Sequence, residues 1–143
     1  MKAGEVLADF QFLGNRVAKF TLETRLVEEK AQGRLDFDFD YEIRSMEEGE
    51  ERFFAVLALM VNVRASKGRN LVFKLSLDME ALFAGSRERF SKDQFVQILE
   101  LNGLITLLHL CRAYVITVTA QSGINPPVRL PMINVLKLRE KKS

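Results

Sequence analysis

Two residue types that often carry chemistry occur only once each in this chain, as His109 and Cys111. They lie two positions apart, which on a helix turns their side chains about 200° away from each other. Side chains at that spacing do not meet, so the pair cannot act as a nucleophile and its base. A single histidine also cannot supply a histidine cluster for zinc. The sequence therefore predicts no catalytic or metal site at these residues.

Asp36, Asp38 and Asp40 repeat the D-x-D-x-D spacing that begins a calcium-binding loop. The glycine of such a loop is missing, and aromatic residues stand between the aspartates. The solvated face of a strand explains this pattern better than a calcium site does. Three aspartates in a row could still help to bind a basic partner.

Motifs of nucleotide-binding and hydrolytic enzymes are missing from the sequence. It contains neither a glycine-rich phosphate loop nor a serine in a nucleophile elbow. The net charge of +2 is too small to indicate binding to nucleic acid. We therefore expect no enzyme activity, no cofactor and no nucleic-acid partner. An enzyme would need a site formed across subunits, for example by paired His109 residues at a symmetry axis.

Length and composition are typical of one soluble domain. The chain has 143 residues, of which 48% are hydrophobic and 28% charged. Its N-terminal segment lacks the apolar core of a secretory signal, and one cysteine cannot form a disulfide within the chain. We predict a single domain over residues 1–143 and a cytoplasmic location.

The first half of the chain has the period of two that marks half-buried strands. Residues Arg34–Arg44 alternate strictly, with aromatic or aliphatic side chains on one face and mostly acidic side chains on the other. A similar alternation covers Val17–Val27, and apolar segments cover Glu51–Ala65 and Asn70–Phe83. Short links that contain glycine join these segments, which favours an antiparallel sheet of four strands.

The third predicted strand differs from the others because both of its faces are apolar. Phe54, Val56, Ala58 and Met60 lie on the face that is polar in the other three strands. An apolar stripe along the outer side of a sheet is either an interface or a binding surface.

A long apolar helix follows the strands. Ser91 and Gln94 have the spacing of a capping box, and the helix is predicted to run from Lys92 to about Ala120. Sixteen of the 24 residues in Phe95–Val118 are apolar. One sheet covers only one face of such a helix, so the remainder must pack on another subunit or on a bound apolar ligand.

The apolar stretch Leu101–Val118 is slightly short for a membrane span and carries polar and charged residues, so we expect no membrane insertion. One narrow stripe of the helix is less apolar and consists of small or weakly polar side chains. Such a stripe suits close packing of helices from two subunits, with a few hydrogen bonds between them. The predicted oligomer interface consists of Asn102, Thr106, His109, Ala113 and Thr117.

The C-terminal part is predicted to be a turn at Asn125-Pro126-Pro127, then an extended arm, and then a short helix from about Asn134. The expected fold is therefore α+β. It has a four-stranded antiparallel sheet followed by one long apolar α-helix and a short C-terminal helix, and it is oligomeric.

The order of these parts resembles the SecB protein-export chaperone family over most of the chain. Phe10-Gln11 followed by Phe20–Glu23 is similar to the first strand of that family, and Phe73–Phe83 is similar to the fourth. The strongest part is Leu104–Asn134, which has an arginine after an apolar run, then a glycine and then the pattern P-x-x-L-P-x-x-N. The matching positions are Arg112, Gly123, Pro127, Leu130, Pro131 and Asn134.

This resemblance implies an ATP-independent holdase, usually a homotetramer built as a dimer of dimers. Unfolded or precursor polypeptides would wrap around it and insert apolar side chains into surface grooves. The duty could be protein export or the protection of an antitoxin. The family docks on the motor protein SecA through acidic residues, and Glu23 matches one such position, whereas Lys19 and Ser76 stand where acids would be expected.

We predict that the client contacts are apolar residues of the second and third strands and of the C-terminal segment. They are Phe37, Phe39, Phe54, Val56, Met60, Leu130, Ile133 and Leu136. Each of them could instead belong to the core or to an interface between subunits. The alternative function is an oligomeric adaptor or scaffold that binds one dedicated folded protein.

Overall fold

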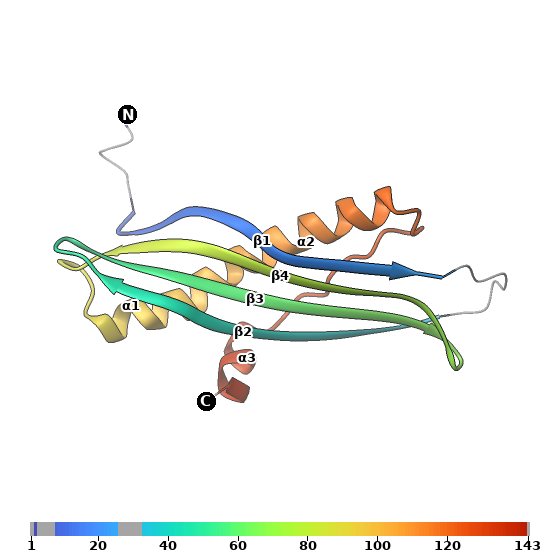
Figure 1. Cartoon of the computed structure of the whole chain (residues 1–143). Helices are drawn as coiled ribbons and strands as arrows, with labels where there is room; N and C mark the ends of the chain where they lie inside the picture. Colours follow the sequence, from blue (N-terminus) through green and yellow to red (C-terminus); the bar gives the residue numbers. More distant parts are fainter. Residues whose placement is uncertain (1, 3–7, 26–32, 143) are drawn as a thin grey trace.

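Four long antiparallel strands form one sheet. The computed structural model describes residues 2, 8–25 and 33–142. The strands are β1 (Phe10–Thr24), β2 (Arg34–Glu48), β3 (Arg52–Lys67) and β4 (Asn70–Ser86), and they lie in the order β1-β4-β3-β2. Consecutive strands β2, β3 and β4 are neighbours, whereas β1 pairs with β4 (Figure 1). The predicted four-stranded antiparallel sheet is confirmed.

The first strand begins earlier than the sequence predicted, at Phe10 instead of Val17. Its pairing with β4 is irregular at two places, one of them between Phe12 and Gly14. An extra residue in one strand changes the face on which the following side chains lie, so the period of two is lost there. The other end of the predicted strand, at Leu26 and Val27, lies outside the described residues, as does Gln32 of the predicted turn.

One long helical run crosses a face of the sheet diagonally, and we call this face the inner face (Figure 1). The run consists of α1 (Lys92–Ile98), a π-helical turn η2 (Leu99–Gly103) and α2 (Leu104–Gln121). The predicted capping box is present, because the Ser91 hydroxyl accepts from the Gln94 N–H at 3.2 Å and the Gln94 side chain accepts from the Ser91 N–H at 2.9 Å. The long helix is confirmed, with the π-helical turn as an unpredicted feature.

The hydrophobic core lies between the inner face and this helix. Alternate residues of β3 from Phe53 to Ala65 point inward, and none of them is more than 6% exposed. The helix contributes fully buried side chains from every turn that faces the sheet. The fully buried apolar side chains are Phe95, Leu99, Leu104, Leu107, Cys111 and Val115. Each large apolar side chain stabilises the fold by about 1.5–3 kcal/mol when buried, so this layer fixes the helix on the sheet.

Two glycines let the helix approach the sheet closely. A Cβ atom at Gly85 of β4 would lie 2.5 Å from Cδ1 of Phe95. A Cβ atom at Gly103 of η2 would lie 3.0 Å from Cδ2 of Leu57. Side chains at these two positions would push the helix away from the strands, because protein interiors have no spare volume.

After α2 the chain turns at Asn125-Pro126-Pro127, where the Asn125–Pro126 peptide bond is cis. It then returns beside α2 as an extended arm and ends in α3 (Val135–Lys142), as Figure 1 shows. The Asn134 side chain accepts a hydrogen bond from the Lys137 N–H at 3.1 Å, which satisfies a free donor of the first turn. The predicted short C-terminal helix is thus confirmed.

By length and composition alone, the helical run Lys92–Gln121 could cross a membrane. The core helix of a soluble protein passes the same test. In this fold one side of the run packs on the sheet, with Phe95 and Leu107 fully buried.

Candidate functional site

The extended arm, residues 127–134, is fixed on α2 by side chains and not by a strand ladder. Thr119 of α2 is fully buried. Its hydroxyl donates to the carbonyl of Val115 at 2.7 Å and accepts from the N–H of Val128 at 2.9 Å. A buried N–H without a strand partner requires such an acceptor. Thr119 therefore sets where the arm begins.

Arg112 holds the middle of the arm. Its Nε donates to the carbonyl of Leu130 and its Nη2 donates to the carbonyl of Pro131, both at 3.1 Å. The side chain of Leu130 turns inward and is 3% exposed. The arm is thus clamped over the apolar side of α2, and open space remains on each side of it.

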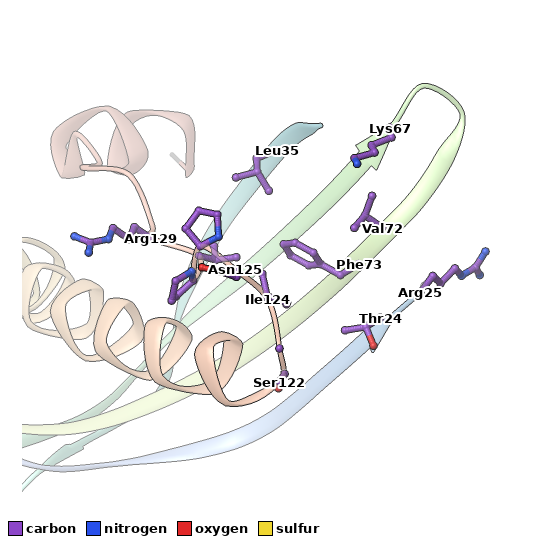
Figure 2. Close-up of a pocket in the computed structure, with 14 residues that line it drawn as sticks. Thr24, Arg25, Leu35, Lys67, Val72, Phe73, Ser122, Ile124, Asn125 and Arg129 are labelled. Atoms are coloured by element: carbon purple, nitrogen blue, oxygen red, sulfur yellow. The ribbon is translucent and has the colours of Figure 1, made fainter. Parts of the chain in front are cut away.

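The first of these spaces, the end cavity, has a volume of about 870 Å³ and lies between the turn after α2 and one end of the sheet (Figure 2). The strands contribute Leu35 at the start of β2 and Val72 and Phe73 at the start of β4. The turn contributes Ile124 and the two prolines. Most of these side chains are apolar, and Leu35 is 47% exposed at the mouth.

Three cationic residues lie at the edge of the end cavity. Arg25, Lys67 and Arg129 line it, and none of its described lining residues is acidic. Figure 2 shows them on three different segments around the apolar side chains. Arg25 forms an ion pair with Glu23 at 3.3 Å, and both side chains are exposed. Within the described part of the chain, Arg129 has no ion pair.

The second space, the helix groove, has a volume of about 610 Å³ and lies between the first half of the helical run and the end of the arm. Leu101, Ile105 and Leu108 line it from the helix, and Met132 and Ile133 line it from the arm. Met132 is 93% exposed. Leu136 of α3 closes one side and is 57% exposed, so the groove is an open apolar surface.

The eight predicted client contacts lie in four separate places. Ile133 and Leu136 line the helix groove. Phe37 and Phe39 are half-buried on the inner face and pack against the core. Leu130 belongs to the core, so we leave it out of the contacts proposed below. The other three residues, Phe54, Val56 and Met60, are half-buried on the outer face of the sheet.

The outer apolar stripe is interrupted by a network of charges. Arg44 reaches from β2 to β4, where its two terminal nitrogens bind Asp78 at 2.6 Å and Glu80 at 2.8 Å. It passes over Ala58 of β3, which pairs with both neighbouring strands at this level and is fully buried. The hydrogen bond from Arg44 lowers the pKa of the Glu80 carboxyl below its usual range. The stripe therefore ends at Val56 and resumes only at Met60.

The predicted interface stripe lies on the side of the helix that faces away from the sheet. Asn102, His109, Ala113 and Thr117 are exposed, and Thr106 is half-buried. The two threonine hydroxyls donate to carbonyls one turn earlier in the same helix, at 2.9 Å and 3.0 Å. They are therefore occupied within the chain, and contact between subunits at this stripe stays a prediction.

The single cysteine and the single histidine lie on different sides of the helix. Cys111 faces the sheet, and burial raises the pKa of its thiol to about 12, whereas His109 is exposed. Of the three aspartates on β2, Asp36 pairs with Arg34 at 3.0 Å and Asp40 pairs with Lys142 of α3 at 3.0 Å. Across the described ranges, no three metal-ligating side chains converge.

Glu23, the predicted SecA contact, lies on β1 at the end of the sheet where the end cavity opens. It is exposed and forms ion pairs with Arg25 at 3.3 Å and with Lys74 at 3.6 Å. An exposed ion pair contributes little to stability, so Glu23 can exchange its partners.

No model of a known protein family matches the chain. An uncharacterized protein of Methanocaldococcus jannaschii is 30% identical over 102 residues, which are 71% of this chain. The match spans 63% of the length of that relative.

Two solved structures are similar over most of the chain. A protein of unknown function from Streptococcus agalactiae has a TM-score of 0.51 at 15% identity and covers 89% of this chain and 100% of its own. A SecB-like chaperone of Mycobacterium tuberculosis, solved in complex with a peptide from an antitoxin, has a TM-score of 0.65 at 18% identity. That match covers 88% of this chain and 91% of the chaperone. The chain therefore has a divergent SecB-like fold.

Proposed function

We propose that this protein is an ATP-independent holdase that binds unfolded polypeptides in the end cavity and the helix groove. The observation that carries the proposal is the open apolar cavity of about 870 Å³ at the end of a SecB-like sheet. A similarly folded chaperone has been solved with a bound antitoxin peptide, which supports a polypeptide as the ligand.

The surfaces suit an unfolded chain better than a small molecule. An extended polypeptide places alternate side chains on one side, and it can insert them into separate apolar spaces. Met132 is unbranched and almost fully exposed, so it can adapt to side chains of different shapes. A holdase of this kind needs no catalytic residue, and it releases its client when the client folds or is passed on.

We further propose that the protein acts as a homo-oligomer in the cytoplasm, with the predicted interface stripe between subunits and a dimer of dimers as the assembly. Asn102 and His109 of that stripe also line the helix groove, so the groove would lie at the edge of the interface. The duty of the protein would be either protein export, with Glu23 as one contact to SecA, or the protection of an antitoxin. The alternative is an adaptor for one folded protein. The rigid charge network around Arg44 favours that alternative, because a fixed pattern of charges suits a fixed partner surface.

The first test is titration calorimetry of the protein against a slow-folding client, first unfolded and then native, without nucleotide. We expect binding to several unrelated unfolded chains and none to their native forms. Binding to one native protein alone would establish the adaptor instead. If the protein binds neither form of any client, the holdase proposal is wrong.

A matched pair of variants locates the site. Leu35 and Leu13 are both large apolar residues of the sheet, 47% and 44% exposed, but only Leu35 lines the end cavity. Leu35→Asp should weaken client binding about tenfold, since the burial of one leucine is lost, and Leu13→Asp should not. Met60→Asp tests the outer stripe in the same assay, with size-exclusion chromatography as the check on assembly. Equal effects of the two leucine variants would exclude the end cavity as the site.

A further inference from the structure

We infer that Met132 is an oxidation site, and that its conversion to the sulfoxide by a peroxide weakens client binding in the helix groove. This inference rests on the proposed holdase function. It goes beyond that function by assigning a modification that regulates one of the two binding spaces.

The exposure of the methionine side chains singles out Met132. Four of the five methionines lie in the described part of the chain. Met132 is 93% exposed, whereas Met79 is 1% exposed. Met46 and Met60 are half-buried, and Met46 packs against the core. A peroxide in solution must reach the sulfur atom to oxidise it, so Met132 should react first among these four methionines.

The single cysteine does not compete for the oxidant. Cys111 is fully buried, and its Sγ lies 4.0 Å from Sδ of Met79 in the core. Burial raises the pKa of its thiol to about 12, and the thiolate is the form that reacts. In the folded protein the accessible sulfur atom of the described residues is therefore that of Met132.

Met132 stands at the lip of the helix groove, among apolar side chains that a client would cover. Leu101 and Ile105 line the groove from the helix, and Ile133 and Leu136 line it from the arm and α3. Ile105 and Leu136 are 46% and 57% exposed. Since nearly all of the surface of Met132 is free, most of its apolar area remains available for burial by a client.

The oxidation needs no catalytic group of the protein. A lone pair of the thioether sulfur attacks one oxygen of hydrogen peroxide, so that a sulfur–oxygen bond forms and the oxygen–oxygen bond breaks. The sulfur loses two electrons, and the departing hydroxide takes the proton of the transferred oxygen and leaves as water. The product is methionine sulfoxide, which is polar.

The sulfoxide changes what the groove can bind. Its oxygen accepts hydrogen bonds from water, and an apolar client side chain that covers it offers none in return. Burial of a polar group without a hydrogen-bond partner costs free energy. Oxidation at Met132 therefore disfavours the client at the lip of the groove, and reduction of the sulfoxide by a methionine sulfoxide reductase reverses the change.

The test treats the purified protein with hydrogen peroxide until one oxygen atom is added per chain, and peptide mass spectrometry locates that atom. Fluorescence anisotropy with one labelled unfolded client gives the affinity before oxidation, after it, and after treatment with methionine sulfoxide reductase and a dithiol. Size-exclusion chromatography checks that the assembly is unchanged. Met132→Leu and Met46→Leu are the matched variants, and each is compared with itself before and after peroxide.

We expect the sulfoxide of Met132 as the first product, with a loss of client affinity of about tenfold, since one large apolar side chain is no longer buried on binding. The reductase should restore the affinity. Peroxide should leave the affinity of Met132→Leu at its starting value, because leucine has no sulfur. Met46→Leu should lose affinity as the unaltered protein does.

Three outcomes would overturn the inference. The first is oxidation of another methionine before Met132, which would mean that Met132 is covered in the assembled protein. The second is an unchanged affinity once Met132 is oxidised. The third is an equal loss of affinity in Met132→Leu, which would place the effect at another residue. Failure of the holdase proposal is distinct, because the unoxidised protein then binds no unfolded client and the claim about binding falls with it.

Discussion

The Nε of Arg112 on α2 donates a hydrogen bond to the carbonyl oxygen of Leu130 at 3.1 Å. With the bond from its Nη2 to Pro131, one side chain joins the long helix to the arm that separates the two apolar spaces. The position of both proposed binding surfaces therefore depends on this guanidinium together with the Thr119 hydroxyl, which fixes the start of the arm.

Replacement of Arg112 by alanine should lower the free energy of unfolding by about 1.5–3 kcal/mol, because hydrogen bonds from a charged donor contribute about that much. Arg112→Lys should recover only part of the loss, since an ammonium lacks the fork that spans two carbonyls. Urea denaturation followed by circular dichroism measures both changes. Arg129→Ala on the exposed side of the arm is the control and should have little effect. If Arg112→Ala and Arg129→Ala lower the free energy of unfolding by the same amount, the two hydrogen bonds from Arg112 to the arm do not contribute to stability.

Gly85→Ala should destabilise the protein by about 1–3 kcal/mol, because the added methyl group overlaps the ring of Phe95 in a packed core. A second substitution, Phe95→Ala, removes both overlapped ring atoms, Cδ1 and Cε1. The double variant should therefore be more stable than the sum of the two single changes predicts, and a double-mutant cycle by urea denaturation measures the difference. Strict additivity would contradict the close approach of these two residues.

Stability should fall below about pH 4.5 in a way that depends on Glu80. The hydrogen bonds from Arg44 and Arg16 hold the pKa of this carboxyl below its value in the unfolded chain. A depressed pKa stabilises the fold above the unfolded pKa, and this contribution is lost as the pH falls through the folded pKa. Glu80→Gln should therefore flatten the dependence of stability on pH between about pH 5 and about pH 3.

The measurement for that variant is the urea midpoint at several pH values. The pKa of Asp40 is also lowered, chiefly by its hydrogen bond with Lys142. Asp40→Asn should therefore flatten the dependence of stability on pH as well, through a carboxyl on another part of the sheet. An unchanged slope in Glu80→Gln would mean that the Arg44 network does not persist in solution.

Cys111 should resist thiol reagents in the folded protein. It is fully buried, and burial raises the pKa of its thiol to about 12, so little thiolate forms near neutral pH. We expect slow reaction with a chromogenic disulfide in buffer and fast reaction of one thiol per chain in urea. Fast reaction of the folded protein would mean that the helix leaves the sheet readily.

Much of the fold could be predicted because the pattern of each element is local. The alternation from Leu35 to Ile43 predicts β2 because a strand turns every second side chain to one face. Ser91 and Gln94 predict the start of the helix because their side chains cap each other's backbone. At α3 the Asn134 side chain accepts a hydrogen bond from the Lys137 N–H in the first turn. A structural feature that depends on a few neighbouring residues can therefore be predicted from the sequence.

Other features could not be read because they depend on residues far apart in the sequence. The end cavity brings Leu35, Phe73 and Ile124 together from three parts of the chain, and no short pattern marks that meeting. Its one sequence signal is the Pro-rich turn, which requires irregular chain beside the sheet. The Arg44 network was also missed, since its partners Asp78 and Glu80 lie on another strand. Leu130 was predicted as a client contact, with the core as its alternative, and its burial depends on where the arm packs.

The pairing of β1 with β4 has a consequence for how the chain folds. Arg16 and Glu80, an ion pair at 2.7 Å, are 64 residues apart in sequence, whereas β2, β3 and β4 join neighbours through short turns. Contacts between distant residues form late because they close a long loop. During synthesis β1 therefore leaves the ribosome first and remains unpaired until β4 follows. For that interval the nascent protein presents an unpaired strand with several exposed apolar side chains, of the kind that the finished molecule is proposed to hold.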